Sequence, residues 1–171
     1  EKNRFPDDPQ ATLYDQMTIT WPVDDYGLPE GHDAPEISDI RIRFSLLPEE
    51  WRPKKGSGGA NNTTIPRGIT KDSNGISILR NYREVWFGTI PYWNRFGPKG
   101  WSRFEDTDRF WGCEVLFDAW LDRAFSVKNI KDGAIPLPEL METIKQQIMP
   151  SRKTAEEEIK RVYAATAAAE R

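Results

Sequence analysis

The chain has 171 residues, a formal net charge of -3, and 37% hydrophobic against 30% charged residues. This length suits one domain with a sizeable core, and the acidic balance argues against a surface built throughout for nucleic acid or an anionic membrane. Cys113 is the single cysteine, which excludes an internal disulfide and a multi-cysteine metal site and favours a cytoplasmic location. No apolar run is long enough to cross a membrane, so no membrane partner is expected.

The domain organisation follows from composition along the chain. The sequence opens on Glu1 rather than Met, which favours a piece of a larger protein. Residues 1–12 are polar and contain Pro6 and Pro9, and are interpreted as an N-terminal arm or linker. Residues 13–135 are expected to form an α+β domain and residues 136–171 its C-terminal helices.

Alternating apolar residues predict the first strands. Met17 to Val23 combines alternation with β-branched threonines, and Ile37 to Leu46 alternates clearly from Ile40 onward. One face of this second strand is apolar, with Ile40, Ile42, Phe44 and Leu46. It is the clearest half-buried strand in the chain.

A hairpin and one more strand complete the predicted sheet. Ile76 to Arg80 and Arg83 to Phe87 are separated by Asn81 and Tyr82, and Asn tolerates the positive φ that a tight two-residue turn needs. Trp111 to Phe117 is predicted as a core strand, followed by a short helical turn with Asp118 as its N-cap. The aromatic-rich stretch 86–125 is interpreted as core.

Residues 52–74 are predicted to form a mobile loop, because the glycine- and asparagine-rich run at 54–63 has little apolar surface. The C-terminal third is predicted to be helical. Leu140, Ile144 and Ile148 form one apolar stripe after Pro138, Pro150 ends that helix, and Thr154 with Glu157 forms a capping box for a second one. The expected fold class is therefore α+β: a mostly antiparallel sheet of about five strands with two C-terminal helices.

Three ordered blocks resemble a known family. Gly75 to Glu84 matches G-I-S-I-x-R-x-x-R-E, residues 108–118 are close to D-R-W-W-G-I-E, and residues 125–132 match G-V-T-N-N-K-Q in part. These blocks are similar to the second, transducer domain of the GHKL ATPase superfamily, which includes gyrases, heat-shock chaperones, MutL and MORC proteins. The resemblance covers about a third of the chain. In the third block, Ser126, Ile130 and Asp132 depart from the pattern.

The resemblance implies a ribosomal-protein-like transducer fold and a role in sensing ATP. The lysine of the third block, which corresponds to Lys131, is implied to contact the terminal phosphate of ATP, with Asn129 shaping its loop. Arg80 and Arg83 are secondary candidates for an interdomain interface. ATP and Mg²⁺ would be bound by an N-terminal module of the same protein, since the sequence has no nucleotide-binding motif of its own and no metal site is expected.

Several alternatives stay open. Lys131 is equally read as a solvated surface lysine, and Arg80 and Arg83 as ordinary polar positions on an exposed hairpin. His32, the pair Asp24 and Asp25, and Cys113 are better explained as loop or core residues than as catalytic or metal-binding groups. The locally basic loop permits binding to nucleic acid without requiring it, through Arg52, Lys54, Lys55, Arg67 and Lys71. A structural role, with a homodimer formed by the last helix, is a further alternative.

Overall fold

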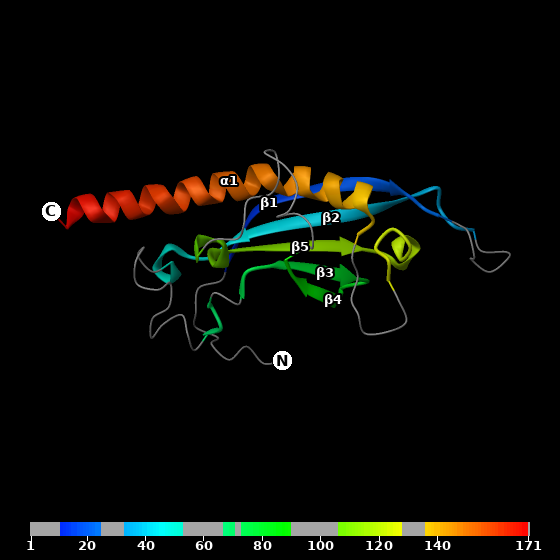
Figure 1. Ribbon diagram of the computed structural model, residues 1–171, viewed down its shortest axis with the longest axis horizontal. Coiled ribbons are helices and arrows are strands. Elements are labelled where there is room, and N and C mark those ends of the chain that lie inside the picture. Colours follow the sequence, from blue (N-terminus) through cyan, green and yellow to red (C-terminus); the bar gives the residue numbers. More distant parts are fainter. Residues whose placement is uncertain are drawn as a thin grey trace.

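The computed structural model describes residues 11–24, 33–52, 67–70, 73–89, 106–127 and 136–170. Their strands form one sheet, and short 3-10 turns and a long helix accompany it (Figure 1). The strands are β1 Thr12–Pro22, β2 Ile37–Leu46, β3 Ile76–Arg80, β4 Arg83–Gly88 and β5 Trp111–Phe117. The turns are η1 Glu49–Trp51, η4 Asp106–Phe110 and η5 Ala119–Leu121, and the helix is α1 Pro138–Ala169.

The sheet has five strands in the order β1-β2-β5-β3-β4. Every neighbouring pair is antiparallel except β3 and β5, which run parallel. The predicted fold class, an α+β fold with a mostly antiparallel sheet, is confirmed. In Figure 1 the long helix α1 lies along the sheet on the side of β1 and β2, and its C-terminal part extends past the ends of the strands.

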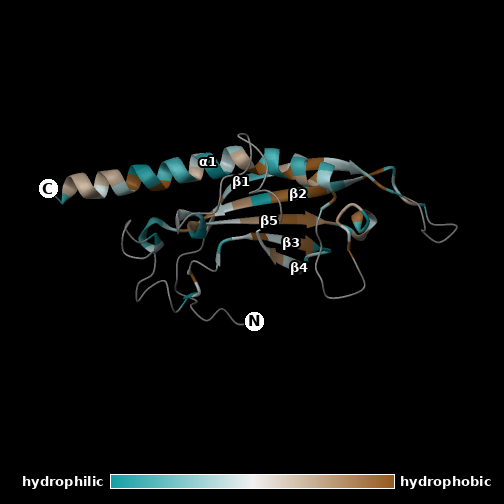
Figure 2. Cartoon of the chain, in the orientation of Figure 1, coloured by the Kyte–Doolittle hydropathy of each residue, from teal (hydrophilic) through white to brown (hydrophobic). Residues whose placement is uncertain are grey.

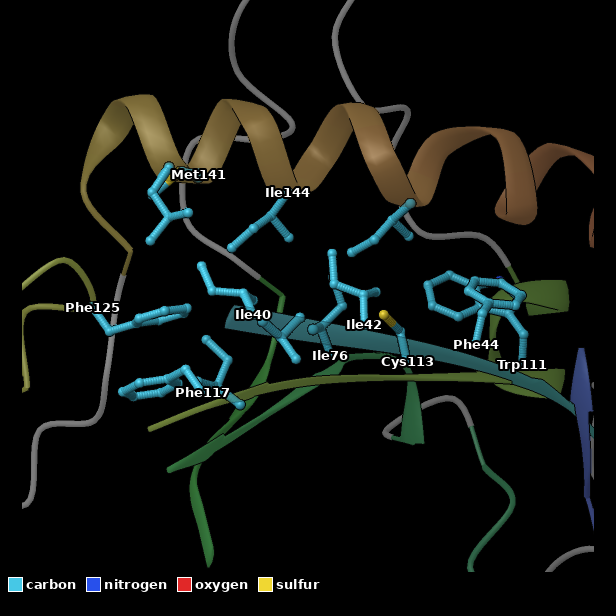
Figure 3. Close-up of a cluster of buried hydrophobic side chains, with 14 of the residues drawn as sticks. Ile40, Ile42, Phe44, Ile76, Trp111, Cys113, Phe117, Phe125, Met141 and Ile144 are labelled. Atoms are coloured by element: carbon cyan, nitrogen blue, oxygen red, sulfur yellow. The ribbon is translucent and has the colours of Figure 1, made fainter. Parts of the chain in front are cut away.

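The core lies between α1 and one face of the sheet. The predicted apolar face of β2 is confirmed, because Ile40, Ile42 and Phe44 are fully buried. Figure 3 shows Ile40 on the side of Met141 and Ile144 of α1, and Phe44 beside Trp111 of β5. Figure 2 shows the same division along the chain, with hydrophobic residues concentrated on the central strands and hydrophilic ones in the middle of α1. Each fully buried side chain of this size stabilises the fold by about 1.5–3 kcal/mol.

The predicted hairpin and the strand after it are confirmed. Asn81 and Tyr82 both have positive φ, 48° and 66°, as a type I′ turn between β3 and β4 requires. Tyr82 occupies a position that favours glycine, and its side chain is exposed. The strand β5 has the predicted bounds, and Cys113 within it is buried as expected.

The predicted break of the C-terminal helix at Pro150 is wrong, since α1 is one continuous helix of 32 residues. A proline inside a helix costs about 3 kcal/mol, because it removes an N–H donor and its ring crowds the preceding turn. Burial on both sides of the proline offsets this cost. Ile144 and Ile148 are buried before it, and Ala155 and Ile159 after it.

The capping box predicted at Thr154 is also wrong. Its hydroxyl donates to the carbonyl of Pro150 at 3.0 Å, a bond inside a continuous helix rather than a cap. The first strand is longer than predicted, since it begins at Thr12 instead of Met17. Its register with β2 shifts between Leu13 and Asp15. Within the predicted loop 52–74, Ile69 is buried.

Candidate functional site

The candidate site lies at the end of the sheet where the β3–β4 turn meets η5. Here Arg80 donates from Nε and Nη2 to the two carboxylate oxygens of Asp122, at 2.6 and 2.7 Å. This hydrogen bond raises the pKa of Arg80, partly opposed by burial, so the guanidinium stays charged. Both side chains are about one-third exposed. Arg80, predicted as an interface candidate, therefore joins the end of β3 to the turn after β5.

Asn81 performs the capping role that the sequence assigned to Asp118. The Asn81 side-chain oxygen accepts the backbone N–H of Ala119 at 3.2 Å, while its own N–H donates to the carbonyl of Phe117 at 2.9 Å. Asp118 does stand at the N-cap position of η5, but its side chain makes no capping bond. The predicted N-cap position of Asp118 is confirmed, but the side-chain acceptor comes from Asn81 of the neighbouring hairpin.

The described residues on both sides of segment 128–135 are hydrogen-bonded to the turn that follows η5. On the near side, the N–H of Val127 donates to the carbonyl of Asp122 at 2.8 Å. On the far side, the N–H of Leu137 donates to the carbonyl of Ala124 at 2.8 Å, just before α1 begins. The predicted site residues Lys131 and Asn129 belong to this segment and lie outside the described residues.

The first of these anchors contains an unusual backbone conformation. Ser126 has a φ of 48°, in the left-handed region that favours glycine. This is the position at which the family pattern has glycine and this sequence has serine. A residue other than glycine in this conformation costs of order 1 kcal/mol.

A pocket of about 230 Å³ opens at the same end of the sheet, between the end of β1 and η5. Its lining is mainly apolar and includes Trp21, Trp120 and Leu137. One ion pair lies at its wall, where Arg123 Nε is 3.2 Å from Asp24 Oδ2 and both side chains are about half exposed. The pocket therefore adjoins the fixed base of segment 128–135.

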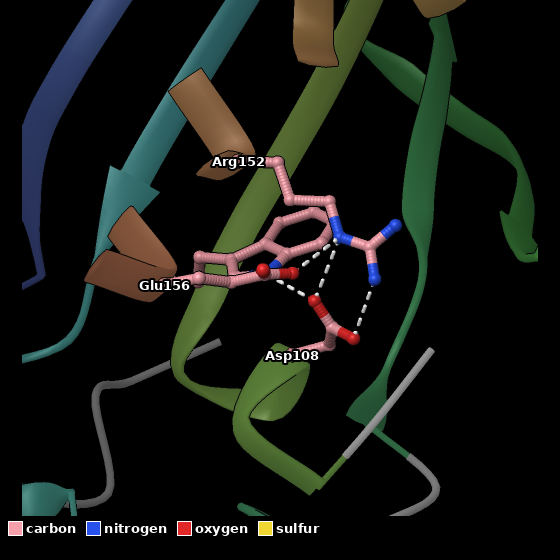
Figure 4. Close-up of polar contacts among 4 residues, drawn as sticks. Asp108, Arg152 and Glu156 are labelled. Carbon is pink, nitrogen blue, oxygen red and sulfur yellow. Dashed lines mark hydrogen bonds and ion pairs between the residues drawn. The ribbon is translucent and has the colours of Figure 1, made fainter. Parts of the chain in front are cut away.

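A second polar cluster, the Asp108 cluster, lies near the opposite end of the sheet and was missed by sequence reasoning. Arg152 of α1 donates from Nε and Nη2 to the carboxylate of Asp108 at 2.9 and 2.8 Å, and Trp111 Nε1 donates to the same carboxylate at 2.8 Å. Glu156 lies 3.0 Å from Arg152 (Figure 4). Asp108 and Arg152 are both buried. The sequence block D-R-x-W-G contains Asp108, but no sequence pattern pointed to Arg152 of α1 as its partner.

Cys113, considered as a candidate nucleophile from the sequence, lies inside the core. The buried position of Cys113 raises the pKa of its thiol, which therefore stays protonated and unreactive near neutral pH. No three His, Cys, Asp or Glu side chains of the described part come together to hold a metal ion. The same residues include no helix with the length and apolar character that a membrane crossing needs.

Comparison with models of protein families, with curated proteins and with solved structures finds no match for this chain. The function is therefore argued from the residues and the geometry above.

The ion pair between Arg80 and Asp122 gives a first prediction. Replacing Arg80 by lysine keeps the charge but removes the planar fork, and we expect a loss of about 1 kcal/mol or less, because both groups are partly solvated. The melting temperature should fall by about 2–4 °C in calorimetry. Arg83→Lys is the matched control on the exposed neighbouring strand and should leave it unchanged. Equal effects of the two substitutions would remove the structural role of this pair.

Proposed function

We propose that this chain is the transducer domain of a GHKL-type ATPase, which senses ATP held by an N-terminal module of the same protein and relays that state. The observation that supports the proposal is the fixed base of segment 128–135, with hydrogen bonds at Val127 and Leu137. A lysine between two fixed points can reach a phosphate only when the two domains are docked, so its contact reports their relative orientation. The hairpin that carries the first sequence block forms part of the same base, through Arg80 and Asn81.

The second support is the connection from this segment into α1. Leu137 anchors the far end of segment 128–135, and Pro138 begins the helix directly after it. A helix of 32 residues is about 48 Å long. Because α1 is packed on the sheet along much of its length, a displacement at its N-terminal end is transmitted along a rigid element. The proposed relay runs from Lys131 through Leu137 to the C-terminal part of α1.

The chemistry proposed for Lys131 is electrostatic. Negative charge develops on the oxygens of the terminal phosphate as it leaves, and an ammonium group positioned there stabilises that charge. Lysine suits this role because it is a compact charge on a flexible stem. In this proposal ATP and Mg²⁺ are held by the N-terminal module, and the isolated chain binds neither.

The decisive test is Lys131→Ala in the protein that includes the N-terminal module. ATP turnover should fall by about 10²-fold, the effect of removing one group that stabilises transition-state charge, while nucleotide affinity changes little. Lys128→Ala, in the same segment, is the matched control and should keep most of the turnover. Unchanged turnover in Lys131→Ala, or micromolar ATP binding by the isolated chain, would contradict the proposal.

A further inference from the structure

Arg52, directly after η1, has buried hydrogen-bond donors that no acceptor satisfies. Its side chain is 6% exposed, and neither Nε nor Nη1 has a hydrogen-bond partner. These two nitrogens carry more than half of the N–H donors of a guanidinium. Buried donors without acceptors are rare in native proteins and destabilise them, so such a group calls for a missing water or ion. The described part of the chain therefore supplies no acceptor for these two nitrogens of Arg52.

Within the described part of the chain, the ion pair of Arg52 with Glu158 is loose. Its Nη2 lies 3.7 Å from Oε1 of Glu158 on α1, beyond hydrogen-bond distance, and the Glu158 side chain is 32% exposed. Glu158 also accepts a hydrogen bond from Tyr14: burial, the carboxylate charge and this bond together raise the pKa of Tyr14. One partly solvated carboxylate is thus shared between two groups, and it does not neutralise a buried guanidinium.

A second buried arginine, Arg109, acts on the same tyrosine as Arg52. Burial raises the pKa of Tyr163, and the charges of Arg52 and Arg109 act in the opposite direction, so both guanidinium groups influence the same phenol. Arg109 is itself buried. Asp108, the one acidic residue buried in the described part of the chain, already accepts from Arg152 and Trp111. A charged acceptor suits the Arg52 guanidinium better than a neutral water molecule, because hydrogen bonds between ionised groups are the stronger ones.

The neighbouring sequence has the same character. Lys54 and Lys55 follow Arg52 closely, and the guanidinium of Arg67 lies over the ring of Trp51, 5.2 Å from its centroid. Arg52, with its unpaired donors, is thus the first residue of a stretch of sequence that is rich in basic residues. Because the contact between Arg52 Nη2 and the Glu158 carboxylate is loose, an incoming anion can replace that carboxylate at Nη2.

We propose that Arg52 is the centre of a binding site for a phosphate-type oxyanion, between η1 and the C-terminal half of α1. The anion takes the place of Glu158 at Nη2 and accepts hydrogen bonds from Nη2 and from one of the two unpaired nitrogens beside it, Nε or Nη1. This site is separate from the one proposed for Lys131. The turn η1 comes after the end of β2, which pairs with the start of β5. The segment 128–135 comes in sequence after the other end of β5. The seven residues of β5 separate these two ends of the sheet by about 20 Å.

The test measures thermal unfolding of the 171-residue chain in a concentration series of inorganic phosphate, against chloride at matched ionic strength. The wild-type melting temperature should rise with phosphate, by about 3–6 °C at ten times the dissociation constant. Arg52→Gln should fold normally, because it removes unsatisfied donors, and should lose this rise. Arg43→Gln, an exposed arginine on β2, is the matched control and should keep it.

A second variant distinguishes the site from general charge screening. Glu158→Gln removes the competing carboxylate and should lower the phosphate concentration needed for half of the effect several-fold. A short single-stranded oligonucleotide in place of inorganic phosphate shows the source of the phosphate group, since only a nucleic-acid site would bind it more tightly than the free ion. Equal phosphate effects in wild type and Arg52→Gln would overturn the proposal and leave a buried water as the acceptor.

Discussion

Replacing Asp108 by asparagine should destabilise the protein by about 3–5 kcal/mol, the usual cost of breaking a buried ion pair by removing one partner. The substitution keeps the shape of the side chain but leaves the guanidinium of Arg152 buried without its main counter-charge. Glu156, at 3.0 Å, compensates only in part because it is more exposed. Calorimetry should show a melting temperature lower by about 6–20 °C.

The control for this prediction is Asp39→Asn, an exposed position on β2, which should change the free energy of unfolding by less than about 0.5 kcal/mol. The double variant Asp108→Asn with Arg152→Met removes both charges, and it should be less destabilised than the sum of the two single variants. If Asp108→Asn were no more destabilising than Asp39→Asn, the Asp108 cluster would not hold α1 on the sheet.

The strands could be predicted because their signal is local. Along β2 the buried and exposed residues alternate, so the pattern from Ile40 to Leu46 alone identifies a strand with one apolar face. The turn at Asn81 and Tyr82 was also local, since two adjacent residues with positive φ define it. The start of β1 at Thr12 was missed because Leu13, Asp15 and Gln16 are exposed and have no apolar alternation.

The single helix could not be predicted because its continuity depends on tertiary contacts. The buried stripe of α1 passes from Ile148 through Ser151 and Arg152 to Ala155, so the two turns around Pro150 present polar residues where the pattern expects apolar ones. Those residues are satisfied by distant elements: Ser151 donates to Asp15 of β1 at 2.5 Å, and Arg152 to Asp108. A proline followed by polar residues therefore resembled a helix end.

At the candidate site, too, the residues with a local sequence pattern could be found, whereas their long-range contacts could not. The sequence blocks include Arg80, Asp108 and Lys131, but Asp108 was not predicted as a site residue, and the contacts of the arginine and the aspartate were not predicted. Arg80 finds Asp122, and Asp108 finds Arg152, across 42 and 44 residues of sequence. No local rule predicts such pairs, since they depend on strand order and on the path of α1. The role of Lys131 stays a prediction, to be tested by ATP turnover.

The base of segment 128–135 rests on an aromatic pair, which gives the last prediction. Phe125 and Phe117 are stacked with ring centroids 3.8 Å apart and an interplanar angle of 7°, and both are buried. Phe125→Ala should cost about 3–5 kcal/mol, because it leaves a cavity beneath η5 and removes the ring contact. The melting temperature should fall by about 6–20 °C.

Hydrogen exchange distinguishes this local role from general core damage. The N–H groups of Val127 and Leu137 hold the two ends of the segment, and they should lose protection in Phe125→Ala before the amides of β2 do. Phe87→Ala is the matched control: this ring on β4 is 48% exposed, so its removal should cost well under 1 kcal/mol. Uniform loss of protection across the sheet would contradict the local role, whereas selective loss would make Phe125 the residue through which the core positions the lysine segment.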